Sequence, residues 1–317
     1  MMPSIGTPLL WAVFLVFVSG GLALDLGVFH RRAHAVRPRE ALGWSAFWVA
    51  LAAVFAVGVW RWYGPQRGLE FLTGYLIEKA LSVDNIFVFL VIFSSFGVPA
   101  AYQHRVLFWG IVGAVVFRLA FILAGAALLA AFHWIIYVFG GLLIVTGLRM
   151  LRSGEEVHPE RNRLVALARR ILPVVSAYRG AAFFVRDGGR LAATPLMIAL
   201  LTVEATDIVF AVDSIPAIFA ITADPFIVFT SNLFAILGLR ALYFLLAGLL
   251  HRFRHLKVGL SLVLIFVGFK MLASDVVEIP VAASLAVVAA LIGASVVASL
   301  LGKPVPVEDQ TASDAAS

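Results

Sequence analysis

Hydrophobic residues follow one another along most of this 317-residue chain in long stretches, which short polar and basic segments separate. An apolar run of about 17–25 residues is long enough to cross the hydrocarbon core of a bilayer as a helix. Nine such stretches are expected, at residues 8–29, 41–62, 69–95, 105–130, 133–151, 193–222, 226–250, 257–273 and 280–301. The pattern therefore predicts an all-α, polytopic integral membrane protein with about nine transmembrane helices.

The composition agrees with a membrane environment. Hydrophobic residues make up 62% of the chain and charged residues 13%, whereas a soluble domain is about 45–50% apolar and about 25% charged. This excludes a cytosolic enzyme and a nucleic-acid-binding domain. The chain contains no Cys, so disulfides, thiolate metal sites and thiol redox chemistry within it are excluded as well.

Basic residues gather on alternate loops. One set of loops is rich in Arg and Lys: it comprises residues 30–39, residue 105, the long segment 152–192, residues 252–257 and Lys303. The other set carries Arg61, Arg67 and Lys270 alone. Because cytoplasmic loops hold most Lys and Arg, we expect an external N-terminus and a cytoplasmic C-terminus. Segment 152–192 is expected to be a solvated linker or an amphipathic helix on anionic lipid, and 303–317 a polar tail.

Two parts of the chain resemble each other. Residues Glu78 to Ile86 (Glu-Lys-Ala-Leu-Ser-Val-Asp-Asn-Ile) match Asp207 to Ile215 (Asp-Ile-Val-Phe-Ala-Val-Asp-Ser-Ile). Two further matches follow in the same order: 122–125 with 245–248, and 147–151 with 268–272. Each copy would contain three spans, which is an odd number, so the two copies begin on opposite sides of the membrane. The loop charges agree with this opposite orientation. Inverted repeats with a mid-membrane site are typical of secondary transporters.

The repeat divides the chain into six parts. Two N-terminal helices occupy 1–62, the first repeat 63–151, the basic loop 152–192, the second repeat 193–273, the last helix 274–302 and the tail 303–317.

Five acidic residues lie inside the third and sixth expected spans: Glu78, Asp84, Glu204, Asp207 and Asp213. An ionisable side chain at the bilayer centre costs about 2.5–3.5 kcal/mol and usually marks a functional site. In a purely structural interpretation these acids pair with Lys79, Arg118 and Arg240. Five negative charges less three positive charges leave two, which one divalent cation or two protons would neutralise. We therefore favour a cation or proton pathway.

The spacing of these residues sets which of them share a helix face. Glu78 and Asn85 are seven residues apart, as are Asp207 and Ser214, and Glu204 lies three residues before Asp207. Asp84 and Asp213 are offset by about 120° from the preceding acid of their motifs. All can converge only if a helix breaks, for which Pro216 offers a place, or if the site spans several helix faces.

Ligand chemistry narrows the ion. Carboxylate, amide and hydroxyl oxygens, including those of Asn85 and Ser214, suit Mg²⁺, Ca²⁺ and Mn²⁺. Asp25 is expected either to guard a cytoplasmic entrance or to pair with Arg31 or Arg32. Asn232 is a neutral ligand or, more commonly at such positions, an interhelical hydrogen-bonding group.

The stretches Phe71 to Ile86, Phe210 to Ala220 and Asp224 to Gly248 resemble the TerC family of bacterial integral membrane proteins. The residues around Gly6 to Trp11 and Asp25 to Ala35 are similar to its Alx branch. The resemblance implies a location in the bacterial inner membrane and export of Mn²⁺ as the transported substrate, with the intramembrane acids as ion ligands. Family names also carry older labels, tellurium resistance and membrane-bound redox modulation.

Alternatives to a metal exporter follow from the same residues. The acids could hold together a stress-response scaffold, or two aspartates could form an intramembrane protease, although neither Asp84 nor Asp213 has a Gly-x-Gly-Asp context. We expect no enzyme and no organic cofactor. The chain has no ATP-binding P-loop, so protons are the expected exchange partner, and the lipid bilayer is the expected environment.

Overall fold

The computed structural model describes residues 4–29, 38–132, 134–152, 173–175, 177–187, 190–246, 255–277 and 279–301; the side chains of 22–29, Pro38, Asp84 and Phe87 lie outside this description. Within these ranges the chain forms ten helices and one small sheet. The helices are α1 (Pro8–Phe29), α2 (Pro38–Tyr63), α3 (Pro65–Ser95), α4 (Ala100–Ala131), α5 (Ile135–Arg152), α7 (Pro195–Phe219), α8 (Pro225–Leu237), α9 (Leu239–Leu246), α10 (Leu256–Leu272) and α11 (Val281–Leu301). Each of the nine expected stretches overlaps a helix or, at 226–250, the pair α8 and α9.

Proline residues define where three helices of the bundle begin. The first turn of α3 contains Pro65, that of α7 contains Pro195, and that of α8 contains Pro225. The first turn has no acceptor for the backbone N–H that proline lacks, and the fixed φ of proline matches a helix. Gly64, with a φ of 92°, makes the sharp turn between α2 and α3, a conformation that favours glycine.

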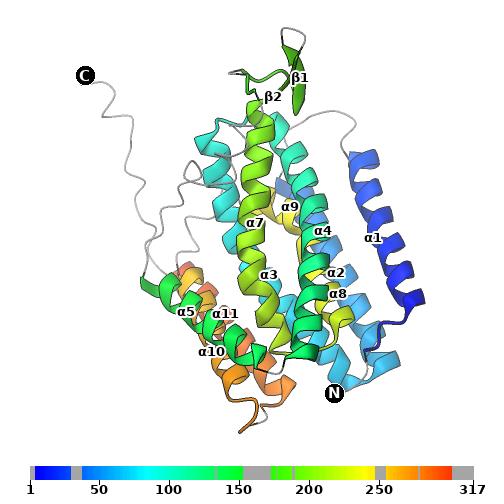
Figure 1. Cartoon of the computed structure of the whole chain (residues 1–317), viewed down its shortest axis with the longest axis vertical. Coiled ribbons are helices and arrows are strands. Elements are labelled where there is room, and N and C mark those ends of the chain that lie inside the picture. The colour runs from blue at the N-terminus through cyan, green and yellow to red at the C-terminus, as the bar shows by residue number, and fades with distance from the viewer. Residues whose placement is uncertain are drawn as a thin grey trace.

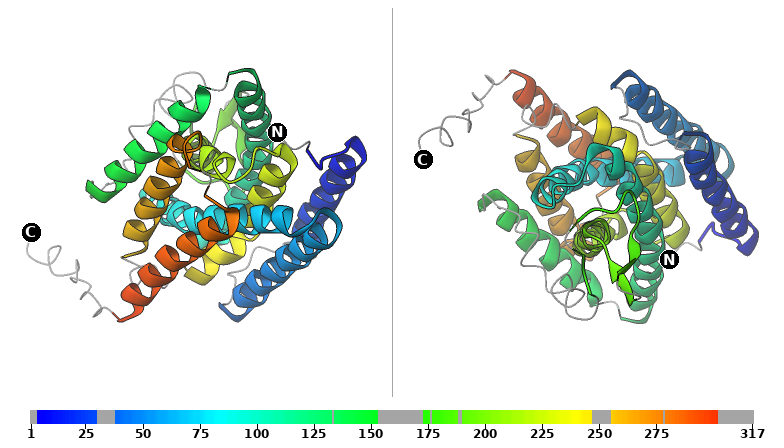
Figure 2. Two further views of the ribbon diagram at one scale, coloured as in Figure 1. Left: turned by 90° about the horizontal axis from the view of Figure 1, so that it is seen from below. Right: turned by 90° about the horizontal axis from the view of Figure 1, so that it is seen from above.

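The helices form a bundle in which α3 lies inside and α7 lies beside it at the front of Figure 1 (Figures 1 and 2). Helix α3 packs against α2, α7, α8 and α11, and α7 packs against α3, α4 and α5. Helix α1 lies at the outer edge of the bundle, as both end views in Figure 2 show. Helix α7 thus packs against other helices on one side and exposes side chains such as Val209 on the other.

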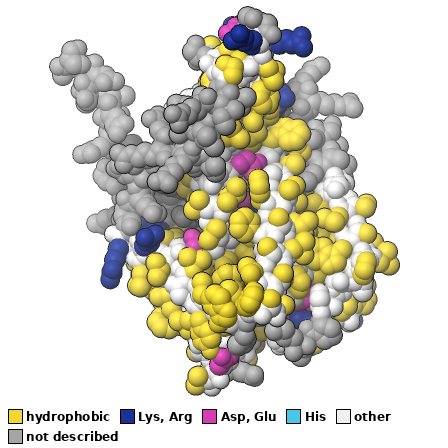
Figure 3. All heavy atoms as spheres, in the orientation of Figure 1, with side chains coloured by type: hydrophobic (Ala, Val, Ile, Leu, Met, Phe, Trp, Pro, Cys, Tyr) yellow, Lys and Arg dark blue, Asp and Glu magenta, His cyan; other side chains and the backbone are white. Residues whose placement is uncertain are grey.

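The outer surface is hydrophobic. Six helical segments of the described chain are long and apolar enough to cross a membrane: Arg39–Tyr63, Ala100–Ala131, Ile135–Arg152, Pro195–Phe219, Pro225–Leu246 and Val281–Leu301. Two other helices are not among these six segments. Helix α10 is shorter, with 17 residues, and α3 contains several charged side chains. Large apolar side chains such as Val54 and Val57 are exposed, and Figure 3 shows such side chains over much of the face formed by α4 and α7. This surface suits contact with lipid.

Two predicted features of the helices differ in the structure. Helix α7 continues through Pro216 to Phe219, so the helix break for which Pro216 offered a place is absent. Pro216 removes one backbone donor three residues before the last residue of the helix. The stretch 226–250, expected as one helix, is instead divided at Gly238 into α8 and α9.

The basic segment 152–192 contains strands, which the sequence did not predict. Strands β1 (Phe184–Asp187) and β2 (Arg190–Ala193) pair antiparallel, with Phe184 opposite Ala193. The hairpin stands at one end of the bundle, where Figure 3 shows basic side chains. Beyond Arg152, which ends α5, the described part of this segment comprises 173–175, 177–187 and 190–192 and holds no helix. Residues 153–172, for which an amphipathic helix was one expectation, lie outside the described chain.

Glycines allow α5 and α10 to approach each other closely. A Cβ atom added to Gly268 would lie 2.7 Å from the carbonyl oxygen of Gly140, and one added to Gly147 would lie 2.7 Å from the carbonyl oxygen of Ser261. Small residues at such crossings let helix backbones pack directly in membranes. The third helices of the two proposed repeats are thus in backbone contact.

Candidate functional site

Arg118 of α4 lies at the centre of a buried ion-pair cluster that joins α3 and α7. Its Nε and Nη2 atoms donate to the two carboxylate oxygens of Asp207 at 3.2 and 2.9 Å. Its Nη1 donates to Oε1 of Glu78 and, at 3.2 Å, to the hydroxyl of Ser214. Arg118 is 1% exposed and Glu78 is completely buried. We call Glu78, Arg118, Asp207 and Ser214 the Arg118 cluster.

The helix faces predicted from spacing explain why these groups meet. Asp207 and Ser214, seven residues apart on α7, contact the same guanidinium, so that prediction is confirmed. Glu78 and Asp207, which occupy equivalent places in the sequence repeat, both accept hydrogen bonds from Arg118. One of the structural pairings that we considered, with Arg118 as counter-ion, is therefore present.

A cavity of about 220 Å³ lies beside this cluster, between α3, α5, α7 and α10. Its walls include side chains from both proposed repeats: Glu78, Asn85, Thr146, Arg149, Asp213 and Ser214. Glu78 and Asn85 both reach it, as their spacing on α3 predicted. Carboxylate, amide and hydroxyl oxygens are ligands suited to Mg²⁺, Ca²⁺ and Mn²⁺. We refer to this space as the acidic cavity.

Two carboxylates of the acidic cavity differ in how they are held. Oδ1 of Asp213 accepts a hydrogen bond of 2.9 Å from the hydroxyl of Thr146 on α5. Oε2 of Glu78 is buried and has no hydrogen-bond partner among the described residues, while its Oε1 binds Arg118. A buried carboxylate oxygen without a partner is costly, and Glu78 is one of the residues that line the cavity.

Glu204 and Asp207 do not line the acidic cavity. The carboxylate of Glu204 lies against the backbone of α4, where a Cβ on Gly113 would overlap it, and its Oε2 is buried without a partner among the described residues. Asp207 instead lines a void of about 10 Å³ that it shares with Arg240 of α9. Of the expected ligands whose side chains are described, four line the acidic cavity, namely Glu78, Asn85, Asp213 and Ser214, and Glu204 and Asp207 do not.

The remaining predicted residues have varied surroundings. The ammonium group of Lys79 donates to the carbonyl oxygen of Ala235 at 3.2 Å, next to the break at Gly238. Asn232 is buried in α8, with no partner for its Nδ2 among described side chains. Asp84 is on α3 and Asp25 on α1, but their side chains lie outside the description. Within the described chain, no three His, Cys, Asp or Glu side chains are close enough to hold a metal ion.

A second polar cluster, which the sequence did not single out, lies at the other end of α3. Glu70 accepts hydrogen bonds from Arg67 at 2.9 Å and from Thr222 at 2.7 Å. Asp224 caps α8 through the N–H of Phe226 at 2.9 Å. An aspartate directly before a proline is a helix-start signal and could have indicated this position.

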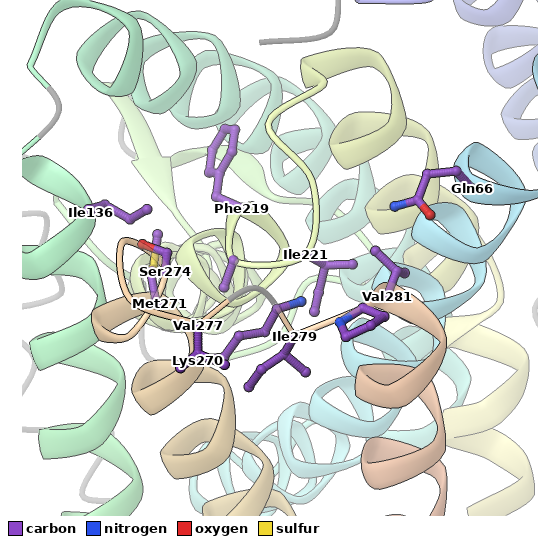
Figure 4. Close-up of a pocket in the computed structure, with 12 residues that line it drawn as sticks. Gln66, Ile136, Phe219, Ile221, Lys270, Met271, Ser274, Val277, Ile279 and Val281 are labelled. Atoms are coloured by element: carbon purple, nitrogen blue, oxygen red, sulfur yellow. The ribbon is translucent and has the colours of Figure 1, made fainter.

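The N-terminal segment is tied to the same cluster. Ser4 donates its hydroxyl to Asp224 at 2.7 Å, and the N–H of Ile5 donates to the second oxygen at 2.8 Å. A larger cavity of about 450 Å³ lies at this end of the bundle. Figure 4 shows Gln66 and the amine of Lys270 reaching into it from different helices, among apolar side chains.

Residues 63–305, which include both acidic motifs, match the model of the integral membrane protein TerC family. The chain belongs to the TerC family. It is therefore a multi-pass integral membrane protein, in agreement with its apolar helices. The resemblance that we drew from the sequence motifs is confirmed.

Several relatives are similar to this TerC protein over almost their whole length. A membrane protein of Myxococcus xanthus, STKORF319, is 61% identical over 300 residues, which are 94% of each chain. A protein of Escherichia coli K12 with the name Alx, described as a candidate membrane-bound redox modulator, is 51% identical over 90% of this chain and 92% of its own. A Rickettsia felis membrane protein is 40% identical over 92% and 98%. No solved structure matches the chain significantly.

Proposed function

We propose that this TerC protein exports divalent metal cations, above all Mn²⁺, across the bacterial inner membrane. The observation that carries the proposal is the acidic cavity, in which oxygen ligands of both proposed repeats meet within a bundle of apolar helices. Such side chains are expensive in a membrane and are usually retained for a substrate or proton pathway.

The order of events in this proposal follows from the positions of the groups. A hydrated ion enters the acidic cavity and exchanges water for oxygens of Asp213, Asn85 and Glu78, which line it. Mn²⁺ loses water more readily than Mg²⁺ and stands above it in affinity for such ligands. Protons that bind the carboxylates in exchange would return the site to its initial state. The N-terminus is then external and the C-terminus cytoplasmic, as the loop charges predict.

A second candidate is a stress-response membrane scaffold, because the Arg118 cluster is a complete structural ion-pair network. In that case the acids hold helices together and no ion crosses. The redox role in the name of the Alx relatives would need chemistry other than thiols, because this chain has no Cys.

A growth experiment distinguishes the two candidates. Cells that lack their own manganese exporter and produce the wild-type chain are challenged with excess Mn²⁺, beside cells that produce Asp213→Asn at an equal membrane level. Export predicts resistance with the wild type and sensitivity with the variant, while Asp187→Asn, in the surface hairpin, keeps resistance. Equal resistance for Asp213→Asn and wild type would remove the cavity from the transport route.

A further inference from the structure

The Arg118 cluster borders two unequal cavities. Glu78 lines the acidic cavity of about 220 Å³, and Asp207 lines the void of about 10 Å³ next to Arg240. The Arg118 guanidinium donates hydrogen bonds to both acids, and the side chain is 1% exposed. Arg118 therefore links the equivalent acids of the two halves, each of which lines a different space.

The oxygens that Arg118 binds are of the kind that a metal ion would need. Both carboxylate oxygens of Asp207 and one of Glu78 accept its N–H groups, as does the hydroxyl of Ser214. A carboxylate oxygen that accepts a charge-assisted hydrogen bond cannot offer the same lone pair to an incoming cation. Of the two carboxylate oxygens of Glu78, Oε1 is bound to Arg118, whereas Oε2 has no hydrogen-bond partner among the described residues.

We propose that Arg118 is a tethered cation that the transported ion displaces, and that this exchange selects divalent over monovalent ions. The inference rests on the proposed function, because it concerns the same site. A monovalent ion that displaced the guanidinium would replace one positive charge by another and would lose four hydrogen bonds. A divalent ion adds a charge, so its attraction to the two carboxylates compensates for that loss.

The same exchange explains how the empty site stays stable. Two carboxylates without a counter-charge would be strongly unfavourable inside the bundle, and Arg118 supplies that charge while no ion is bound. Arg118 is therefore a positioning and specificity-determining residue. Once displaced, its guanidinium no longer joins Glu78 beside the acidic cavity to Asp207 beside the smaller void.

The test measures whether Mn²⁺ can replace the missing cation. Purified wild-type protein, Arg118→Gln and Arg67→Gln are heated in detergent with and without Mn²⁺. Arg67 is the matched control because it is also buried and paired with a glutamate of α3, Glu70, but lies outside the acidic cavity. We expect Mn²⁺ to raise the melting temperature of Arg118→Gln by about 5 °C more than that of either other protein, with an Mn²⁺ Kd about tenfold lower than that of the wild type.

Equal Mn²⁺ stabilisation of Arg118→Gln, Arg67→Gln and wild type would overturn the inference. If Arg118→Gln cannot be recovered from membranes, Arg118→Lys serves instead, because an ammonium lacks the planar fork that holds both acids. Mn²⁺ should then stabilise Arg118→Lys more than wild type, and equal stabilisation again overturns the inference. When Na⁺ replaces Mn²⁺, the melting temperature of the wild type should not rise. A rise equal to that with Mn²⁺ would contradict the proposed selectivity for divalent ions.

Failure of this inference and failure of the proposed function give different results. Mn²⁺ flux through wild-type protein in liposomes, without extra stabilisation of Arg118→Gln, leaves the exporter and removes the role of Arg118. Extra stabilisation without flux leaves a cation-binding cluster and removes export.

Discussion

Acidic residues a few positions apart on α7 have different environments, and these determine what each substitution should do. Asp207 is buried and binds Arg118 through both oxygens. Asp213 is only half-buried and accepts a hydrogen bond from the neutral Thr146. Removing one partner of a buried pair leaves the other charge without compensation, whereas Asp213→Asn keeps a side-chain oxygen that can accept the hydrogen bond of Thr146.

The first prediction compares these two positions. Asp207→Asn should lower the stability of the protein by about 3–5 kcal/mol, because Arg118 loses its bidentate partner. Asp213→Asn should cost about 1 kcal/mol or less while it abolishes ion transport. Melting temperatures in detergent, together with membrane abundance, measure the difference. A larger loss of stability for Asp213→Asn than for Asp207→Asn would be incompatible with the Arg118 cluster.

The second prediction concerns the cap of α8. Asp224→Ala removes the acceptor of the Phe226 N–H and of both contacts to the N-terminal segment. A lost N-cap costs about 1–2 kcal/mol. Asp224→Asn should retain part of the cap, so its stability should lie between that of the wild type and that of Asp224→Ala. Hydrogen exchange at the start of α8 measures the effect, and unchanged protection in Asp224→Ala would show that the cap is not stabilising.

At the scale of helices, hydrophobic length was sufficient to predict most elements. Six of the expected stretches contain segments that are long and apolar enough to span a membrane. The division at Gly238 was not predicted. Lys79 of α3 donates to the carbonyl oxygen of Ala235 beside it, a contact between helices that apolar length does not reveal. The hairpin was missed because four-residue strands give too short a pattern to separate from a loop.

The candidate site was predictable where it depends on one helix and not where it depends on several. Spacing on α3 and α7 correctly placed Glu78 with Asn85, and Asp207 with Ser214. Spacing could not show that α4 inserts Arg118 between the two acids, nor that Glu204 turns toward Gly113. These contacts follow from the packing of α4 on α7, which is a tertiary property. The membership of the acids in one ion site stays a prediction.

The third prediction tests the contact between α5 and α10. Gly268→Ala places a Cβ at 2.7 Å from the carbonyl oxygen of Gly140 and 2.8 Å from a methylene carbon of Ile144. The helices must separate, so the protein should melt at a lower temperature and reach a lower membrane level. Gly141→Ala, also on α5, meets no atom within 4 Å and should behave like the wild type. Equal behaviour of the two variants would contradict the close packing.

At the scale of the whole molecule, the TerC fold combines a lipid-facing exterior with charges that are kept inside. Apolar side chains such as Val54 and Val57 are exposed on the outside, while Glu78, Arg118 and Asp207 are buried. This distribution is opposite to that of a soluble protein and is what a pathway within a bilayer requires.

The fourth prediction concerns the orientation of the molecule. The hairpin end should be cytoplasmic and the turn between α2 and α3 external, because the first is rich in arginine. Single cysteines are introduced at Arg190 and at Trp62, which is 82% exposed, into a chain without native Cys. A membrane-impermeant thiol reagent applied to intact cells should label position 62 and not position 190. Labelling at 190 alone would reverse the assigned direction of transport.

The central claim is that a divalent cation crosses the membrane through the acidic cavity. The most direct measurement is the flux of Mn²⁺ into liposomes that contain purified wild-type protein or Asp213→Asn, with Asp187→Asn as the control. Wild type and control should move Mn²⁺ at equal rates, and Asp213→Asn should lower the rate to that of liposomes without protein. Mn²⁺ flux that is the same with Asp213→Asn as with wild type, or no flux with any of the three, would contradict the account.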